Sequence, residues 1–157
     1  MSISPEFLRK MGYKFARAIL SYDSLQPEER LWRAVVVNAV EDCLIVHSDR
    51  KSSLIKCRSH NWIMDHDAFE TVCDYGKLDC DTMKSCYVEA VKNRVVKFSM
   101  KQIAWYKYDR LYKKMLASER TKRKLYRVEL NKMRPAVVQS STDFITTLFT
   151  EALSKIV

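Results

Sequence analysis

The chain has 157 residues, of which 47% are hydrophobic, only 2 Gly and 3 Pro, and a formal net charge of +9. The apolar content excludes wholesale disorder, and the scarcity of turn residues disfavours β folds and glycine-rich phosphate loops. We therefore expect an all-α fold, in which residues 1–157 form a single compact helical domain of about six or seven helices.

Membrane and secretory segments are not expected. No run of the sequence approaches the roughly 18 consecutive apolar residues of a membrane span. The first 14 residues lack an apolar run and carry four charged residues, Glu6, Arg9, Lys10 and Lys14. This pattern is not that of a secretory signal, and we expect a cytoplasmic protein.

The first third of the chain predicts two helices. Pro5 and Glu6 open the first, whose apolar positions at helical spacing are Phe7 or Leu8, Met11, Phe15 and Ile19. Pro27 with two following acids suits the start of the second helix. The nearly continuous apolar run 31–45 indicates burial on most sides. A buried strand is the competing interpretation because valine is β-branched, and the length of the run favours the helix.

The middle of the chain predicts shorter helices. We expect a loop over 47–52, a helix over 53–64, and an N-cap at Asp67 for a short helix over 68–75. Asp79 or Asp81 then caps a helix with apolar residues Met83, Cys86, Tyr87, Ala90, Val91 and Val95.

The C-terminal half predicts an amphipathic helix and a terminal helix. The first has apolar residues at i, i+3, i+4, i+7 and i+8, namely Tyr108, Leu111, Tyr112, Met115 and Leu116. Residues 120–124 are interpreted as a charged bridge, and 125–133 as either helix or a short strand. Arg134-Pro135 is expected to break the chain before a terminal helix over about 142–157.

Residues 68–95 have the spacing of a helix-turn-helix-like unit. Such a unit needs a small residue where the helices cross and apolar residues after the turn. The residues at these crossing, post-turn and inward positions are Cys73, Leu78, Met83 and Cys86. Lys77 falls at the turn, where a positive φ favours glycine, and Asp79 and Asp81 would face phosphates badly. The alternative is an ordinary corner between two core helices.

The same region resembles a motif of small bacterial and prophage-associated proteins. The pattern is Trp62-Ile63, then Phe69-x-x-Val72-Cys73-Asp74-x-x-x-Leu78-Asp79-x-Asp81. In those proteins, Trp-Leu or Trp-Ile precedes Phe-x-x-Val-Cys and a Gly-Leu-Asp-Pro turn. Here Lys77 replaces the Gly and Cys80 the Pro. The resemblance covers residues from about 30 to 90 and implies a bacterial or phage origin more than a particular chemistry.

The positive charge is concentrated in one stretch of the chain. Residues 1–90 hold 12 Lys+Arg and 14 Asp+Glu, whereas residues 91–134 hold 15 Lys+Arg and 3 Asp+Glu. An ordinary solvated face mixes both signs, so this imbalance indicates a polyanionic partner or an acidic protein surface.

We expect a nucleic-acid-binding regulatory or accessory protein, with duplex DNA favoured over RNA. Residues 92–134 would supply affinity by neutralising phosphates, and Lys84, Ser85 and Val88 any sequence preference. The expected binding residues are Lys84, Ser85, Lys92, Lys97, Lys101, Lys107, Arg110, Lys113, Lys114, Arg120, Lys122, Arg123, Lys124 and Arg127. The further cations Lys132 and Arg134 complete the basic stretch.

Aromatic residues lie between these cations, and they have two interpretations. Trp105, Tyr106, Tyr108, Tyr112 and Tyr126 are of the type that stacks on unpaired bases. Packing into the core is the competing interpretation, and it explains Tyr108, Tyr112 and Met115 well.

Neither a cofactor nor catalysis is expected. The five cysteines include no Cys-x-x-Cys pair, and Cys57-x-x-His60 falls short of the four ligands of a zinc site. No catalytic motif is present, and Asp65-His66-Asp67 is interpreted as a polar turn. The alternative function is a protein-interaction module that docks on an acidic surface. Binding to an anionic membrane is disfavoured because the basic helix lacks a broad Leu/Phe face.

Overall fold

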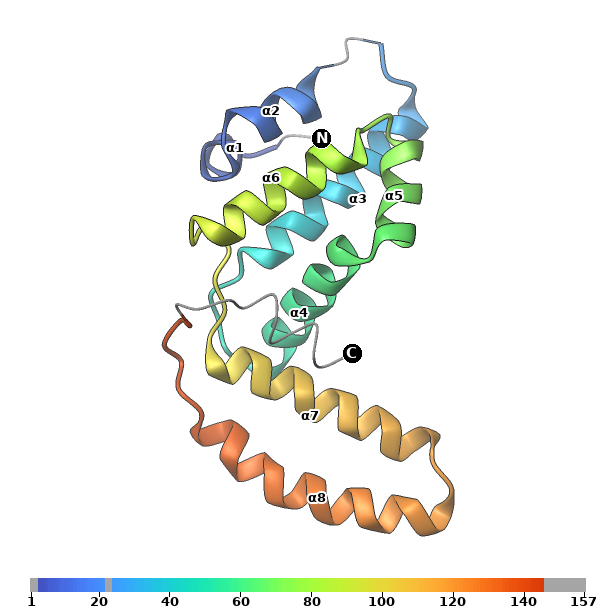
Figure 1. Cartoon of the computed structure of the whole chain (residues 1–157), viewed down its shortest axis with the longest axis vertical. Helices are drawn as coiled ribbons and strands as arrows, with labels where there is room; N and C mark the ends of the chain where they lie inside the picture. Colours follow the sequence, from blue (N-terminus) through green and yellow to red (C-terminus); the bar gives the residue numbers. More distant parts are fainter. Residues whose placement is uncertain (1–2, 22–23, 146–157) are drawn as a thin grey trace. The chain divides into compact units, whose positions relative to one another are not determined.

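The computed structural model describes residues 3–21 and 24–145, and in these residues it has eight α-helices and no strand (Figure 1). The expected all-α fold is confirmed, with more helices than the six or seven expected. No helix in this part of the chain is long and apolar enough to cross a membrane. The helices are α1 (Pro5–Met11), α2 (Tyr13–Leu20), α3 (Pro27–Cys43), α4 (Arg50–Met64), α5 (His66–Tyr75), α6 (Cys80–Lys92), α7 (Met100–Ala117) and α8 (Arg120–Gln139).

The helices divide into two compact units, and the single domain expected from the sequence stays a prediction. The first unit comprises residues 1–45 and 58–97, and the second unit comprises residues 46–57 and 98–157. Helix α4 therefore contributes its first half to the second unit and its second half to the first unit.

The core of the first unit forms around α3. Val36, Val37, Val40 and Cys43 on this helix are at most 1% exposed, which agrees with burial on most sides. The single N-terminal helix expected from the sequence is wrong, because Gly12 separates α1 from α2. Its φ of +88° is open to glycine and ends the helical conformation there.

The turn between α5 and α6 has a positive φ at Lys77, the residue that the helix-turn-helix-like spacing places there, while the helix-turn-helix-like unit itself stays a prediction. Lys77 has a φ of +51°, the N–H of Leu78 donates to Cys73 O at 2.8 Å, and the N–H of Lys77 donates to Asp74 O at 3.1 Å. This is a Schellman motif with a lysine at the position where glycine is favoured. Apolar positions on both sides of the turn are buried: Cys73, Leu78, Met83 and Cys86.

A buried arginine holds this turn in place. Arg33 of α3 is 4% exposed and donates hydrogen bonds to the carbonyls of Gly76 at 2.7 Å, Ile19 at 2.6 Å and Lys77 at 3.1 Å. A Cβ on Gly76 would lie 3.2 Å from Arg33 Cγ and 3.3 Å from its backbone nitrogen. Gly76 is therefore suited to the close approach of α3, while Lys77 takes the positive φ.

Asp65 and Asp79 begin the helices of this corner. Asp65 accepts hydrogen bonds from the backbone N–H groups of Asp67 and Ala68 and is the N-cap of α5. The prediction of an N-cap at Asp67 is therefore wrong by two residues. Asp79 accepts from the N–H of Thr82 and caps α6. Both carboxylates satisfy amide donors that have no partner within the helix.

A second Schellman motif ends α6 at Arg94, which has a φ of +60°. A glycine at this position is therefore expected to stabilise the protein. Arg94→Gly is expected to raise the free energy of unfolding by about 1 kcal/mol, because glycine adopts this conformation without a Cβ clash. Urea denaturation measures the change. Lys92→Gly, inside the last turn of α6, is the control and is expected to lower it by about 1 kcal/mol. A lowered stability for Arg94→Gly would contradict the assignment.

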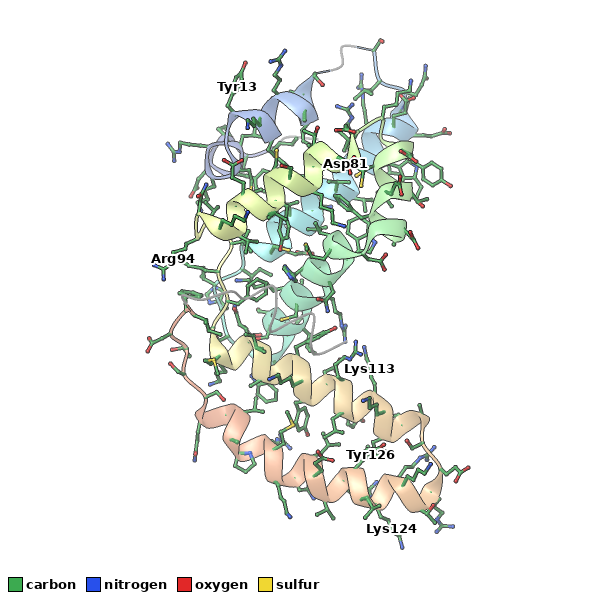
Figure 2. The ribbon with its side chains drawn as sticks, viewed as in Figure 1. Tyr13, Asp81, Arg94, Lys113, Lys124 and Tyr126 are labelled. Carbon is green, nitrogen blue, oxygen red and sulfur yellow. The ribbon has the colours of Figure 1, made fainter. Side chains whose placement is uncertain are left out.

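The second unit contains an antiparallel hairpin of α7 and α8 (Figure 1). The positions of α8 that are not exposed recur at intervals of four and three residues, as in a helix that packs along one seam: Tyr126, Leu130, Met133 and Val137. In Figure 2, Tyr126 lies between the two helices, and Lys124 projects from the side of α8 away from α7.

Three predictions fall on this hairpin and the residues after it. Residues 120–133 are helical throughout, so a bridge over 120–124 is wrong. The break at Arg134-Pro135 is also wrong, since Pro135 lies inside α8. The i−4 carbonyl that it leaves unbonded belongs to Asn131, an exposed residue that water can solvate. Residues 141–145 are not helical, and the remainder of the expected terminal helix lies outside the described residues.

Candidate nucleic-acid interface

The two compact units differ strongly in charge. The second unit contains 16 Lys+Arg and 6 Asp+Glu in its sequence, a net charge of +10, whereas the first contains 12 and 13, a net charge of −1. Of the fourteen expected binding residues, ten belong to the second unit. The other four, Lys84, Ser85, Lys92 and Lys97, belong to the first.

Two residues of the first unit that were expected to contact DNA bases, Lys84 and Ser85, are poorly placed for that contact. Lys84 is half-buried, and its ammonium donates to the carbonyl of Met64 at 3.0 Å, near the end of α4. Ser85 is exposed, but the exposed carboxylates of Asp79 and Asp81 lie at the start of the same helix. The role of α6 in reading DNA stays a prediction, and Lys84 already has a structural bond.

Helix α8 carries the densest positive charge of the second unit. It has seven Lys+Arg and one acid, Glu129, and all seven cationic residues are exposed. Arg120, Arg127 and Arg134 follow one another at intervals of seven residues. Seven residues are about 20° short of two helical turns, so the three arginines form a stripe about 21 Å long on one side of α8. We call these three residues the arginine stripe.

Two of the expected binding residues have local partners. Arg123 donates to the carbonyls of Ser118 at 2.8 Å and Leu116 at 3.2 Å, where it caps the end of α7. Lys113 pairs with Asp109 one turn earlier on α7, at 3.3 Å. These side chains stabilise the hairpin, and the substitution of Arg123 would disturb the turn as well as the charge.

The other cations of the hairpin are not neutralised internally. Within the described ranges, no carboxylate lies at ion-pair distance from Lys101, Lys107, Arg110, Lys114, Arg120, Lys122, Lys124, Arg127, Lys132 or Arg134. Their charge is therefore available to an external anion.

A groove of about 500 Å³ lies on the second unit, between the start of α4, α7 and the end of α8. Its lining includes Arg50, Lys101, Trp105 and Val138. Backbone and polar contacts hold the surrounding segments in place. Gln102 donates to the carbonyl of His47 at 2.9 Å, Ser48 bonds Ser99 at 2.8 Å, and the N–H of Lys101 donates to Ser141 O at 3.0 Å.

Arg50 lies against two aromatic rings of α7. Its guanidinium carbon is 5.9 Å from the ring centroid of Trp105 and 5.5 Å from that of Tyr108, while the two rings meet edge to face. The contact is of the cation–π type, and it holds the guanidinium against the two rings. In the part of the chain that is described, this guanidinium donates no hydrogen bond and pairs with no carboxylate.

The neighbouring Asp49 carboxylate is already engaged by α4. It accepts from the N–H of Ser52 at 3.0 Å, and hydrogen bonds from the backbone and side chain of Ser52 lower the pKa of Asp49. Trp105 differs, because its indole N–H is shielded from solvent and has no acceptor among the residues described. Nearly all buried donors are paired in proteins, so this one is an exception.

The groove and the arginine stripe lie on the same side of the hairpin. Val138 of α8 lines the groove together with Lys101 and Trp105 of α7. At 100° per residue, the members of the arginine stripe lie within about 40° of Val138 around α8. Tyr112 lies seven residues after Trp105, within about 20° of it around α7, and is 37% exposed. Arginines and aromatic residues therefore share one surface.

Three members of this surface were not among the binding residues expected from the sequence. Trp105 and Arg134 were counted within the basic stretch but not selected, and Arg50 was assigned to a loop outside it. The seven-residue spacing of the arginines was a usable signal once 120–139 was recognised as helix. Nothing in the sequence relates Arg50 to Trp105, which lies 55 residues later.

No metal centre emerges from the described residues, which contain no group of three or more potential ligands from His, Cys, Asp and Glu. Cys57 and His60, whose spacing suggested ligands, have other contacts. The thiol of Cys57 donates to the carbonyl of Gln102 at 3.8 Å, and the Nδ1 atom of His60 lies 2.6 Å from the Tyr87 hydroxyl.

Comparison with known proteins adds no family to this picture. No protein-family model matches the chain, and no curated protein and no solved structure matches it either. The resemblance of the Trp62 to Asp81 region to prophage-associated proteins thus stays a prediction.

Proposed function

We propose that the protein binds nucleic acid through its second unit and acts as an accessory or regulatory factor rather than as an enzyme. One observation carries the proposal: this unit has a net charge of +10, and most cations of its helical hairpin have no carboxylate partner among the residues that the structure describes. Nucleic acids are the common polyanions whose phosphates such side chains neutralise.

The form of the charged surface also supports this function. The arginine stripe extends about 21 Å along α8, a length that covers several successive phosphates of an extended strand. Arginine binds phosphate through a planar fork of N–H donors, which gives directed contacts. Lysines on the other sides of the hairpin, such as Lys107 and Lys114, would add long-range attraction.

Titration of the protein with random-sequence oligonucleotides at two salt concentrations tests this proposal. Fluorescence anisotropy is expected to give micromolar or tighter dissociation constants at low salt. The logarithm of the binding constant should fall with the logarithm of salt with a slope of about −3 or steeper, because several condensed counterions are released. Absence of binding at low salt, or binding that salt does not weaken, would refute the function.

A second candidate function is docking on an acidic protein surface. The exposed apolar side chains Leu125 and Val128, 72% and 55% exposed, lie beside Lys124 on α8 and favour it. Protein interfaces combine apolar contacts with complementary charge, whereas phosphates do not need such apolar groups. Nuclease treatment separates the two functions, since a protein partner stays bound after the nucleic acid is digested.

A further inference from the structure

We propose that the groove lined by Arg50, Lys101, Trp105 and Val138 binds an unpaired base and its flanking phosphate, so that the second unit prefers single-stranded nucleic acid to duplex. This inference rests on the proposed function and adds the class of nucleic acid. It differs from the duplex DNA expected from the sequence.

The size and composition of the groove suit one nucleotide. Its volume of about 500 Å³ falls within the range of about 300–1,000 Å³ of small-molecule sites. Two cations, an indole and an aliphatic side chain line it, and the lining acid Asp49 is engaged by the N-terminus of α4. Anionic phosphate next to a flat apolar base is the ligand that matches this combination.

Arg50 supplies the stacking surface. Its guanidinium lies over Trp105 and Tyr108 and has its N–H donors uncommitted within the described residues. Bases stack on arginine planes and on aromatic rings when they are not paired inside a duplex. In this position, the guanidinium of Arg50 can stack on a base, and its N–H groups can donate hydrogen bonds to a phosphate or to a base edge.

A nucleic-acid duplex would bind poorly in this groove. The bases of a duplex are stacked on one another and paired, so only phosphates and groove edges reach a protein surface. A single strand can place one base in the groove while its neighbouring phosphates reach Lys101 and continue along the arginine stripe. The exposed ring of Tyr112, on the same side of α7, is positioned to contact a second base.

Anisotropy titrations of the full chain with labelled oligothymidylate of about 12 nucleotides, and with a duplex of equal length, test the preference. The single strand is expected to bind about 10-fold more tightly. Arg50→Gln should weaken single-strand binding about 10-fold and duplex binding about 2-fold. Arg50→Lys should also lose most of the preference for the single strand. Lysine keeps the charge of Arg50 but lacks the planar guanidinium on which a base can stack.

Lys107→Gln is the matched control, since it removes one charge from the side of α7 opposite Trp105. It should lower the affinity for the single strand and for the duplex about 2-fold each. In a W32F/W62F variant, Trp105 is the remaining tryptophan, and the single strand should quench its fluorescence whereas the duplex should not. Equal affinity for the two ligands, with Arg50→Gln indistinguishable from Lys107→Gln, would overturn this inference and leave the proposed function standing. Failure to bind either ligand would overturn both.

Discussion

Replacement of Arg120, Arg127 and Arg134 together by glutamine is expected to lower the affinity for nucleic acid about 100-fold at moderate salt. Each arginine that contacts a phosphate releases about one counterion, so the salt slope should become shallower by about 3. The three side chains are exposed and have no internal partner among the described residues, so stability should change by less than about 0.5 kcal/mol. Anisotropy titrations at several salt concentrations measure both quantities, and thermal unfolding checks the fold.

A charge-matched triple variant controls for net charge. Lys107→Gln, Lys114→Gln and Lys122→Gln remove the same charge, and these residues lie roughly opposite Trp105 on α7 or opposite Arg120 on α8. The expected loss is less than about 10-fold, since distant cations act mainly through screened attraction. If the two triple variants lose affinity equally, binding follows total charge, and the interface is not on the arginine stripe.

Arg33→Met is expected to lower the stability of the first unit by about 3–5 kcal/mol. The guanidinium donates to the carbonyls of Ile19, Gly76 and Lys77, and methionine leaves these acceptors without that donor. The bonds join α3 to the end of α2 and to the turn between α5 and α6, so their loss affects three segments. Urea denaturation followed by circular dichroism measures the change.

Arg30→Met is the matched control for this prediction. Arg30 lies on the same helix one turn earlier, is exposed, and is expected to change stability by less than about 0.5 kcal/mol. If Arg33→Met does not fold, Arg33→Lys serves instead, because it keeps the charge and reaches fewer carbonyls, with an intermediate loss. Equal stability of the Arg30 and Arg33 variants would show that the hydrogen bonds of Arg33 do not hold the turn.

Local chemistry explains why parts of the fold were predictable. Pro27 and the following acids mark the start of α3 because they suit the positive end of a helix. The corner between α5 and α6 was expected from the spacing of Cys73, Leu78 and Met83, which lie within ten residues of one another. Such short-range preferences are encoded by neighbours in the sequence, and they survive in the tertiary structure.

Predictions failed where a weak local signal met a long-range contact. Pro135 was read as a break, but the seam that includes Leu130 and Val137 packs α8 along α7 and keeps the helix continuous across the proline. Residues 125–133 stayed open between helix and strand because Tyr126, Val128 and Leu130 alternate with polar residues, as in a strand. The stabilisation of α8 comes from α7 rather than from its own propensities.

The sequence by itself determined the helical class, the starts of α1 and α3 at Pro5 and Pro27, and the excess of cations in the stretch from residue 91 to 134. These properties follow from composition and from periodicity over a few residues. Only the tertiary structure decided that residues 46–57 join this stretch, that Arg50 lies over Trp105, and that Arg123 and Lys113 are engaged locally. Contacts between residues far apart in the chain depend on how helices pack, and no local pattern specifies them.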